Sequence, residues 1–343
     1  MSTSAPVMPP EAAAQLLTQI ATGHIVASAL QVAVRLGIAD RLAVHSRTVA
    51  ELAGQTGANE DALYRVLRAL ASVGVFEETM PRRFGLTAAG EMLRTDAPGS
   101  MRDMALWISS PFHFNVYAEL MHSVMTGQPA AEKVTGTPMF EYFPRNPELS
   151  EIFNNAMTAF SKSVVPAALA AYDFTGIERL VDVAGGHGAV LTAILQRYPA
   201  MQGVLFDLEH VIAGAKPRLA ALGLEGRCAA EAGDFFAAVP AGDAYIMKHI
   251  IHDWDDQRAT RILRNIRTAM GNTRGRVILL ESVLPQGNAP DFGKIIDLEM
   301  LAMPGGRERT AEEFEALFAE AGFNLTRIVP TGSPLSVIEA RAE

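Results

Sequence analysis

From residue 178 onward, short apolar runs alternate with amphipathic stretches, and this alternation restricts the fold more than any other feature. Five apolar runs share this setting: ERLVDV, GVLFD, RCAAEA, AYIMK and RVILLE. Segments with helical periodicity, such as AVLTAILQRY and DQRATRILRNIRTAM, lie between them. Because such alternation is typical of parallel βαβ units, we expect an α/β fold with a doubly wound sheet. NLTRIV and LSVIEA, after the helical segment AEEFEALFAEAGF, would complete that sheet.

The first part of the chain predicts helices and a short ribbon. TVAELAGQTG and ANEDALYRVLRALASVG predict two helices, the second capped by Asn59 and ending at Gly74. VFEE and RFGLT predict two short strands joined by a turn at Met80 and Pro81. This helix–helix–ribbon order is typical of a winged-helix domain. We therefore expect three parts: a helical, winged-helix-like domain at 1–100, a helical connector at 101–175 and the α/β domain at 176–343.

Composition narrows the class of protein. The net charge of −9 over 343 residues disfavours nucleic acid and acidic membranes as partners. Residues 45–94 contain six basic and six acidic side chains, which is a poor footprint for DNA. Cys228 is the only cysteine, so a thiolate metal cluster is excluded. We see neither a signal peptide nor an apolar run of about 18 residues, and expect a cytoplasmic protein.

A glycine-rich turn connects the first strand of the α/β part to its helix. In LVDVAGGHGAVLTAIL, Gly185, Gly186 and Gly188 let the backbone approach a ligand closely. A tight turn with a purely structural role would have the same residues. Asp207 ends the next strand, where an acid in a nucleotide site accepts hydrogen bonds from ribose, although a helix N-cap is the alternative. Asp234 follows one strand later and would reach the same edge of the sheet.

The acids around this turn help to choose between two nucleotide-like ligands. A dehydrogenase fingerprint requires a glycine where Leu191 stands, three residues after Gly188. Asp182 lies just ahead of the glycines and would repel a diphosphate. S-adenosylmethionine carries a sulfonium, an ammonium and a ribose but no phosphate. These residues therefore favour S-adenosylmethionine over NAD.

The segment MKHIIHDWDD follows another expected strand and supplies a candidate general base. The imidazole of His252 has a pKa suited to accepting a proton near neutral pH. Glu281, which closes RVILLE, and Glu308, in GGRERT, are expected at the same edge, where a carboxylate would fix the tautomer of the imidazole. A helix cap is the alternative for His252, and an acid favoured by a helix dipole is the alternative for Glu308. We expect His249 to be structural, and no His–acid spacing predicts a metal site.

Taken in order, these motifs closely resemble the plant-type small-molecule O-methyltransferase family, which includes caffeate and acetylserotonin methyltransferases and bacterial members. The resemblance rests on the motifs LVDVAGGHGAV, FDLEHVI, GDFF, MKHIIHDWDD, ILLESVLP and GGRERTAEEFEALFAEAGF. The resemblance spans nearly the whole chain. It implies a class I methyltransferase with a Rossmann-like catalytic domain and an N-terminal dimerisation domain. It also implies a homodimer in which N-terminal helices intertwine, and S-adenosylmethionine without a metal.

The resemblance further implies the site residues. His252 would be the catalytic base, flanked by Glu281 and Glu308. The expected cofactor-binding residues are Ser161, Asp182, Gly185, Gly186, Gly188, Asp207, Leu208, Gly233, Asp234, Phe235 and Lys248. The expected acceptor-binding residues are Trp107, Phe112, Met121, Met157, Phe160, Asp253, Met300 and Met303; ordinary core packing is the alternative for many of these.

Three positions depart from the family pattern. Ala184 replaces the first of three glycines, which we expect to be a mild change. Met303 stands where many plant relatives carry asparagine, and Phe160 stands where some carry histidine. Both make the expected acceptor site more apolar, which favours a bulkier and flatter aromatic or polyketide-like acceptor.

The predicted function is methyl transfer to a hydroxyl of such a small molecule. N-methylation in the same site is an alternative, as is a member of the family that has replaced methyl transfer by decarboxylation or hydroxylation. An NAD-dependent dehydrogenase and a winged-helix regulator are the alternatives outside the family.

Overall fold

The computed structural model describes residues 8–343, which divide into two compact units. The first unit comprises the chain up to Asn115 together with Glu148–Ala159. The second comprises Val116–Pro147 and Phe160–Glu343. Residues of the expected connector belong partly to one unit and partly to the other, so the three-part division stays a prediction.

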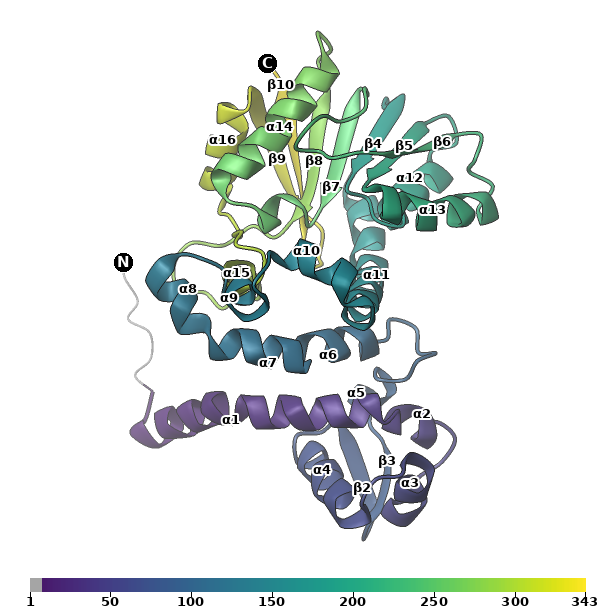
Figure 1. Cartoon of the computed structure of the whole chain (residues 1–343), viewed down its shortest axis with the longest axis vertical. Helices are drawn as coiled ribbons and strands as arrows, with labels where there is room; N and C mark the ends of the chain where they lie inside the picture. The colour runs from purple at the N-terminus through teal and green to yellow at the C-terminus, as the bar shows by residue number, and fades with distance from the viewer. Residues whose placement is uncertain (1–7) are drawn as a thin grey trace. The chain divides into compact units, whose positions relative to one another are not determined.

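The first unit combines helices with a small antiparallel sheet of order β1-β3-β2. Its elements are α1 (Pro10–Arg35), α2 (Ile38–Leu42), β1 (Arg47–Thr48), α3 (Val49–Thr56), α4 (Glu60–Ser72), β2 (Phe76–Met80), β3 (Arg83–Leu86), α5 (Ala88–Glu91) and α6 (Arg102–Ile108). The order of α3, α4, β2 and β3 confirms the predicted winged-helix pattern (Figure 1).

Helix α4 shows why this part of the sequence folds locally. The side chain of Asn59 accepts a hydrogen bond from the backbone N–H of Ala62 at 3.0 Å, which confirms the predicted N-cap. Leu63, Leu67 and Leu70 recur on one face of the helix and are buried in the core of the unit. Capping and burial together therefore fix where α4 begins and which face it turns inward.

Helix α1 differs from α4 because much of its apolar surface is exposed. Leu17, Ile20 and Ile25 are 66%, 68% and 58% exposed. By length and composition alone, α1 could cross a membrane, with a mean hydropathy of 1.3 over its most apolar window. The sequence therefore contains a candidate segment that our expectation of no membrane-spanning run missed. One such helix near the N-terminus is weak support for a membrane span, and an exposed apolar face also suits a protein partner.

The second unit begins with short helices and then forms a large sheet. Its helical elements are α8 (Leu120–Thr126), α9 (Ala130–Thr135), α10 (Met139–Tyr142), η1 (Phe143–Arg145), α12 (Ala189–Arg197), α13 (Glu209–Ala221), η2 (Ile251–Asp253), α14 (Asp256–Met270), α15 (Gly293–Ala302) and α16 (Ala311–Glu320). Its strands are β4 (Arg179–Val183), β5 (Gln202–Asp207), β6 (Cys228–Ala232), β7 (Ala244–Lys248), β8 (Arg276–Glu281), β9 (Phe323–Pro330) and β10 (Ser336–Ala342). Helices α7 (Pro111–Ala118) and α11 (Pro147–Ala171) contribute residues to both units.

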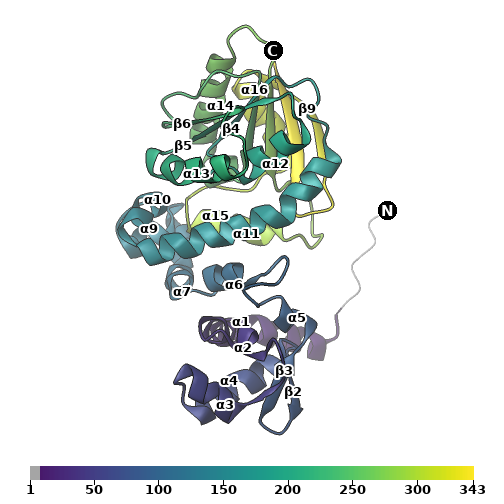
Figure 2. The ribbon, with the colours of Figure 1, turned by 90° about the vertical axis from the view of Figure 1, so that its right-hand side faces the viewer.

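The seven strands are ordered β6-β5-β4-β7-β8-β10-β9. The first five run parallel, and β10 pairs antiparallel with both β8 and β9. One apolar core joins the sheet to α11, α12 and α13, and a second joins its other face to α14 and α16 (Figures 1 and 2). The structure confirms the predicted doubly wound α/β fold. The strand order reverses between β4 and β7, which is where ligands bind in such sheets.

A buried carboxylate ties α11 to the antiparallel end of the sheet. Glu339 on β10 is only 2% exposed and accepts a hydrogen bond from the hydroxyl of Tyr172, directly after α11. The guanidinium groups of Arg327 and Arg341 donate to it at 2.8 and 3.0 Å, and the hydroxyl of Thr326 donates at 3.1 Å. These partners satisfy a charge that burial alone would make costly.

Candidate active site

The candidate active site lies at the carboxyl edge of the sheet in the second unit. Strands β4 and β7 end there on either side of the order reversal, at Val183 and Lys248. Strands β5 and β8 end nearby in Asp207 and Glu281. The sheet topology therefore brings the motifs that were predicted at strand ends to one edge of the sheet.

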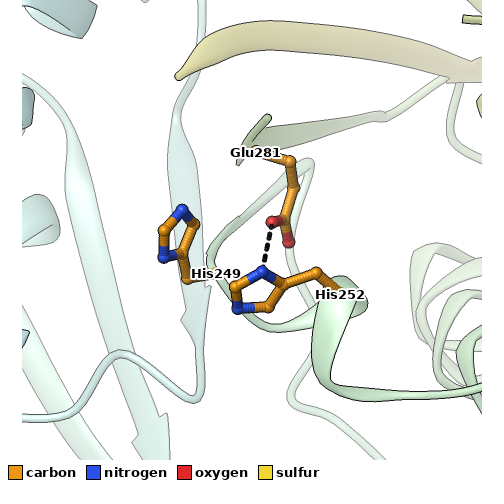
Figure 3. A group of neighbouring side chains, drawn as sticks. All are labelled: His249, His252 and Glu281. Atoms are coloured by element: carbon orange, nitrogen blue, oxygen red, sulfur yellow. Dashed lines mark ion pairs between the residues drawn. The ribbon is translucent and has the colours of Figure 1, made fainter. Parts of the chain in front are cut away.

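His252, in the short helix η2, is held between two glutamates. Its Nδ1 lies 2.7 Å from Oε1 of Glu308 and 3.8 Å from Oε2 of Glu281, the pair marked in Figure 3. The other oxygen of Glu281 accepts hydrogen bonds from the backbone N–H groups of Ile250 and Ile251, both at 3.0 Å. This pattern favours a proton on Nδ1, donated to Glu308. Nε2 is then the nitrogen that can accept a proton from another molecule.

Burial and charge act in opposite directions on His252. Burial by itself lowers the pKa of the imidazole, but the carboxylates of Glu281, Asp253 and Glu308 outweigh it and raise the pKa to about 10. Burial raises the pKa of Glu281, although the charge of His252 opposes that shift. Burial also raises the pKa of Asp253 to about 6. The cluster thus stabilises an imidazolium, the product of proton transfer to His252.

The loop after α15 holds the turn that carries His252. The guanidinium of Arg309, 1% exposed, donates to the carbonyl oxygens of Ile251 and Trp254 at 3.2 and 2.9 Å. The backbone N–H of Arg307 donates to the carbonyl of His252 at 2.8 Å. A Cβ at Gly306 would lie 2.0 Å from that same carbonyl, so only glycine fits there. Sequence reasoning missed Arg309, because its partners are backbone atoms of a distant segment.

The glycine-rich turn leaves room for a ligand beside two acids. Gly186 has φ +59°, and no heavy atom lies within 4 Å of where its Cβ would be. Its backbone N–H donates to Oδ2 of Asp207 at 2.8 Å, and the N–H of Leu208 donates to Oδ1 at 2.7 Å. Each carboxylate oxygen retains a lone pair that can accept from ribose hydroxyls. The carboxylate of Asp207 therefore holds the glycine-rich turn and can also accept hydrogen bonds from a ligand.

Asp182 lies below the same turn. It is 1% exposed, and its Oδ2 has no hydrogen-bond partner among the described residues. Burial raises the pKa of this carboxyl to about 7, and the charge of Asp207 adds to the shift. A carboxylate in such a place favours a cationic group as its partner. This orphaned oxygen, the open face of Gly186 and Asp207 together fit the ammonium and ribose of S-adenosylmethionine.

The other expected cofactor residues lie on neighbouring segments. The N–H of Gly233 donates to the carbonyl of Asp207 at 3.0 Å, which joins the ends of β5 and β6. Asp234 accepts from the N–H of Phe236, and Phe235 packs 6.0 Å from the ring of Trp254. Burial lowers the pKa of Lys248. Three more expected residues are the half-buried Gly185 and the buried Gly188 and Ser161.

The expected acceptor-binding residues fall into two groups. Phe160, Asp253, Met300, Met303 and Met121 belong to the second unit, together with His252. Asp253 Oδ1 lies 3.5 Å from Nε2 of His252, Met303 is 1% exposed, and Met121 is 70% exposed. Trp107, Phe112 and Met157 belong to the first unit, where Trp107 stacks on Phe112 with 6.1 Å between ring centroids. The acceptor-binding roles of all eight residues stay predictions.

His249 lies beside His252 in an arrangement that the sequence pattern does not reveal. Its ring stacks on Phe160 at 4.9 Å and lies 4.3 Å from the ring of His252, and its backbone adopts φ +52°. Ligand atoms of His249, His252 and Glu281 all lie within 4.8 Å of one another (Figure 3). No spacing in the sequence reveals this grouping, because Glu281 comes from another strand. The left-handed turn at His249 could not be seen in the pattern either.

Comparisons with known proteins agree over nearly the whole chain. A family model described as an O-methyltransferase domain matches residues 117–324, and one described as an O-methyltransferase dimerisation domain matches residues 18–96. A phenazine O-methyltransferase of Lysobacter antibioticus is 46% identical over 327 residues, which is 95% of each chain.

Solved structures are similar as well. The structure titled as that of LaPhzM has a TM-score of 0.91 at 44% identity and covers 98% of this chain and 100% of its own. An O-methyltransferase from neocarzinostatin biosynthesis, in complex with S-adenosylmethionine and 2-hydroxy-5-methyl naphthoic acid, has a TM-score of 0.81 at 33% identity. The match covers 99% of this chain and 100% of that one.

Proposed function

The chain belongs to the family of S-adenosylmethionine-dependent O-methyltransferases that carry a dimerisation domain, and we propose that it methylates a hydroxyl of a flat, fused-ring aromatic acceptor such as a hydroxyphenazine. It is an enzyme that transfers a methyl group from this cofactor to a hydroxyl of a small molecule. The dehydrogenase and the DNA-binding regulator, which the sequence left as alternatives, are wrong for this family.

The acceptor class is supported by a relative and by the site. The relative that is 46% identical over 95% of the chain is named for a phenazine substrate. In this chain, Met300 and Met303 are buried apolar side chains on α15 and just after it, and Phe160 stacks on His249. Apolar and aromatic side chains suit a flat acceptor with few polar groups.

In the proposed mechanism, His252 removes the proton of the acceptor hydroxyl. The bound cofactor supplies a methyl group on a positively charged sulfur, which needs no further activation. Nδ1 of His252 keeps its proton and donates it in a hydrogen bond to Glu308, while Nε2 takes the proton from the hydroxyl as the hydroxyl oxygen attacks the methyl carbon. Asp182 and Asp207 would hold the cationic and ribose ends of the cofactor.

The single observation that carries the mechanism is the 2.7 Å contact between Nδ1 of His252 and Glu308, which leaves Nε2 available. We expect His252→Ala to lower turnover at least about a hundredfold, since general base catalysis contributes that much. Calorimetry should show unchanged S-adenosylmethionine binding. A variant that methylates at the wild-type rate would remove the base assignment.

A panel of acceptors tests the substrate class with labelled cofactor and mass detection of products. We expect hydroxyphenazines to give a higher kcat/KM than hydroxynaphthoates and single-ring phenols. A labelled aminophenazine would instead indicate N-methylation, and an unlabelled but altered product would indicate another reaction. A preference for single-ring phenols would contradict the proposed acceptor class.

A homodimer is part of the proposal, because the match to a dimerisation domain includes most of α1, with the exposed apolar side chains of Ile20 and Ile25. That match also favours a protein partner over a membrane for this helix. The cytoplasmic location stays a prediction.

A further inference from the structure

Three potential metal ligands meet beside the proposed base. His249 follows β7, His252 lies in η2 and Glu281 ends β8, so three segments contribute one ligand each. Their ligand atoms lie within 4.8 Å of one another, and all three side chains are drawn in Figure 3. Nε2 of His249 and Oε2 of Glu281 are buried and have no hydrogen-bond partner among the described residues. The cluster thus holds donor atoms that the proposed mechanism does not use.

The geometry is close to that of a tetrahedral metal site. Bonds of about 2.1 Å from zinc to nitrogen or oxygen place neighbouring ligand atoms about 3.4 Å apart. Nδ1 of His252 and Oε2 of Glu281 are 3.8 Å apart. Binding would draw the ligand atoms, now within 4.8 Å of one another, closer to that spacing.

The charge around the cluster also favours a cation. The carboxylates of Glu281, Glu308 and Asp253 surround His252, and Lys248 is the nearby amine. Oε2 of Glu308 is another buried oxygen without a partner among the described residues. Buried carboxylates in excess of cations are costly, and a divalent ion would offset that excess.

The kind of donor selects the kind of ion. Two imidazoles with one carboxylate suit zinc and similar transition ions. Magnesium and calcium prefer sites made entirely of oxygen ligands, so these ions fit poorly.

We propose that His249, His252 and Glu281 bind a divalent transition ion such as Zn²⁺, and that the bound ion inhibits methyl transfer. The ion would coordinate Nδ1 of His252, whose proton would pass to Glu308, and Nε2 would take up a proton from solvent. A neutral imidazole coordinated through Nδ1 carries its one proton on Nε2, so it cannot accept another. Binding rests on the geometry of the cluster, whereas inhibition also rests on the proposed role of His252 as base.

Binding can be measured without any acceptor. Calorimetric titration of the chelator-treated wild-type protein with Zn²⁺ alone should reveal one site per chain that is lost or weakened at least about tenfold in His249→Asn and His249→Phe. Asparagine tolerates the left-handed backbone at this position, and phenylalanine retains the stacking on Phe160. His45→Asn, which removes an exposed imidazole in the other unit, should bind Zn²⁺ like the wild type. Equal affinity in the wild type and in both His249 variants would overturn the site.

Inhibition is measured next, with a hydroxyphenazine as the acceptor. We expect Zn²⁺ to inhibit the wild type and the His45→Asn variant, and the concentration for half inhibition to rise at least about tenfold in both His249 variants. Added chelator should restore activity. Zinc that binds at this site without slowing turnover would overturn the inhibitory step. The activity assay of His252→Ala contains no metal, so it tests the role of His252 as base independently of zinc binding.

Discussion

At the scale of single residues, the catalytic proposal depends on which nitrogen of His252 is free. Glu308 fixes that choice from a buried position, and its own backbone N–H donates to Oδ1 of Asp297 on α15 at 2.8 Å. A carboxylate here both orients the ring and stabilises its protonated form. Glu308 therefore acts through His252.

Replacement of Glu308 by Gln keeps the size of the side chain and removes its charge. We expect kcat to fall at least about tenfold, because the imidazolium formed in the reaction loses a charged partner. Affinity for S-adenosylmethionine, measured by calorimetry, should stay unchanged. Glu315→Gln removes the same charge from an exposed position on α16 and should leave kcat unaltered. Equal turnover in the two variants would argue against the role of Glu308.

Residues also show where the sequence was informative. Asp207, Glu281 and His252 could be placed at one sheet edge, because each follows an apolar run and parallel strands end on the same side. Ala184 was expected to be a mild departure from glycine, yet it adopts φ +56°, a conformation that costs an L-residue roughly 1–2 kcal/mol. A dihedral angle of this kind depends on the packed turn and not on the local pattern.

At the scale of elements, the existence of strands β4 to β8 followed from alternation, but the positions of the last two strands in the sheet did not. β10 inserts between β8 and β9, so the final strand is central and the preceding one is the edge. The apolar pattern of LSVIEA fits either position. The central position of β10 gives Glu339 its partners Tyr172 and Arg327, which lie on other segments that only the folded sheet brings beside it.

The Glu339 cluster predicts a dependence of stability on pH. Burial by itself would raise the pKa of Glu339, but hydrogen bonds from Tyr172, Arg327 and Arg341 outweigh it and lower the pKa to about 2. The pKa of Glu339 in the folded state therefore lies below its value of about 4.3 in the unfolded chain. The ionised carboxylate thus stabilises the fold fully above pH ~4.3, and this contribution is lost as the pH falls toward ~2.

Chemical denaturation of the wild type and Glu339→Gln should show this dependence. We expect the free energy of unfolding at pH 7 to be lower in the variant by up to about 3 kcal/mol. Solvent screens the half-exposed arginines, which makes the expected difference smaller than this upper limit. The difference should shrink between pH ~4 and pH ~2. Glu320→Gln, which removes an exposed ion pair with Arg264, should change stability by less than about 1 kcal/mol. A difference that is independent of pH would contradict the assignment.

At the scale of the whole molecule, the exposed face of α1 predicts self-association. Ile20 is 68% exposed, and the dimerisation-domain match begins two residues before it. Ile20→Glu places a charge on the apolar face and should convert a dimer to monomers, measured by light scattering after size exclusion. Gln19→Glu adds the same charge at a polar position of the same helix and should remain dimeric. Monomeric wild-type protein would contradict the proposed dimer.

The central position of β10 also has a consequence during synthesis. Until residues 336–342 leave the ribosome, β8 lacks one of its two neighbours and presents an open row of backbone hydrogen-bonding groups. Because Ser336 pairs with Glu281, the nascent chain cannot finish the part of the sheet around Glu281 before translation of that strand. Ribosomes stalled just before this strand should therefore carry chains that are more readily cleaved by proteases around Glu281 than chains stalled after it.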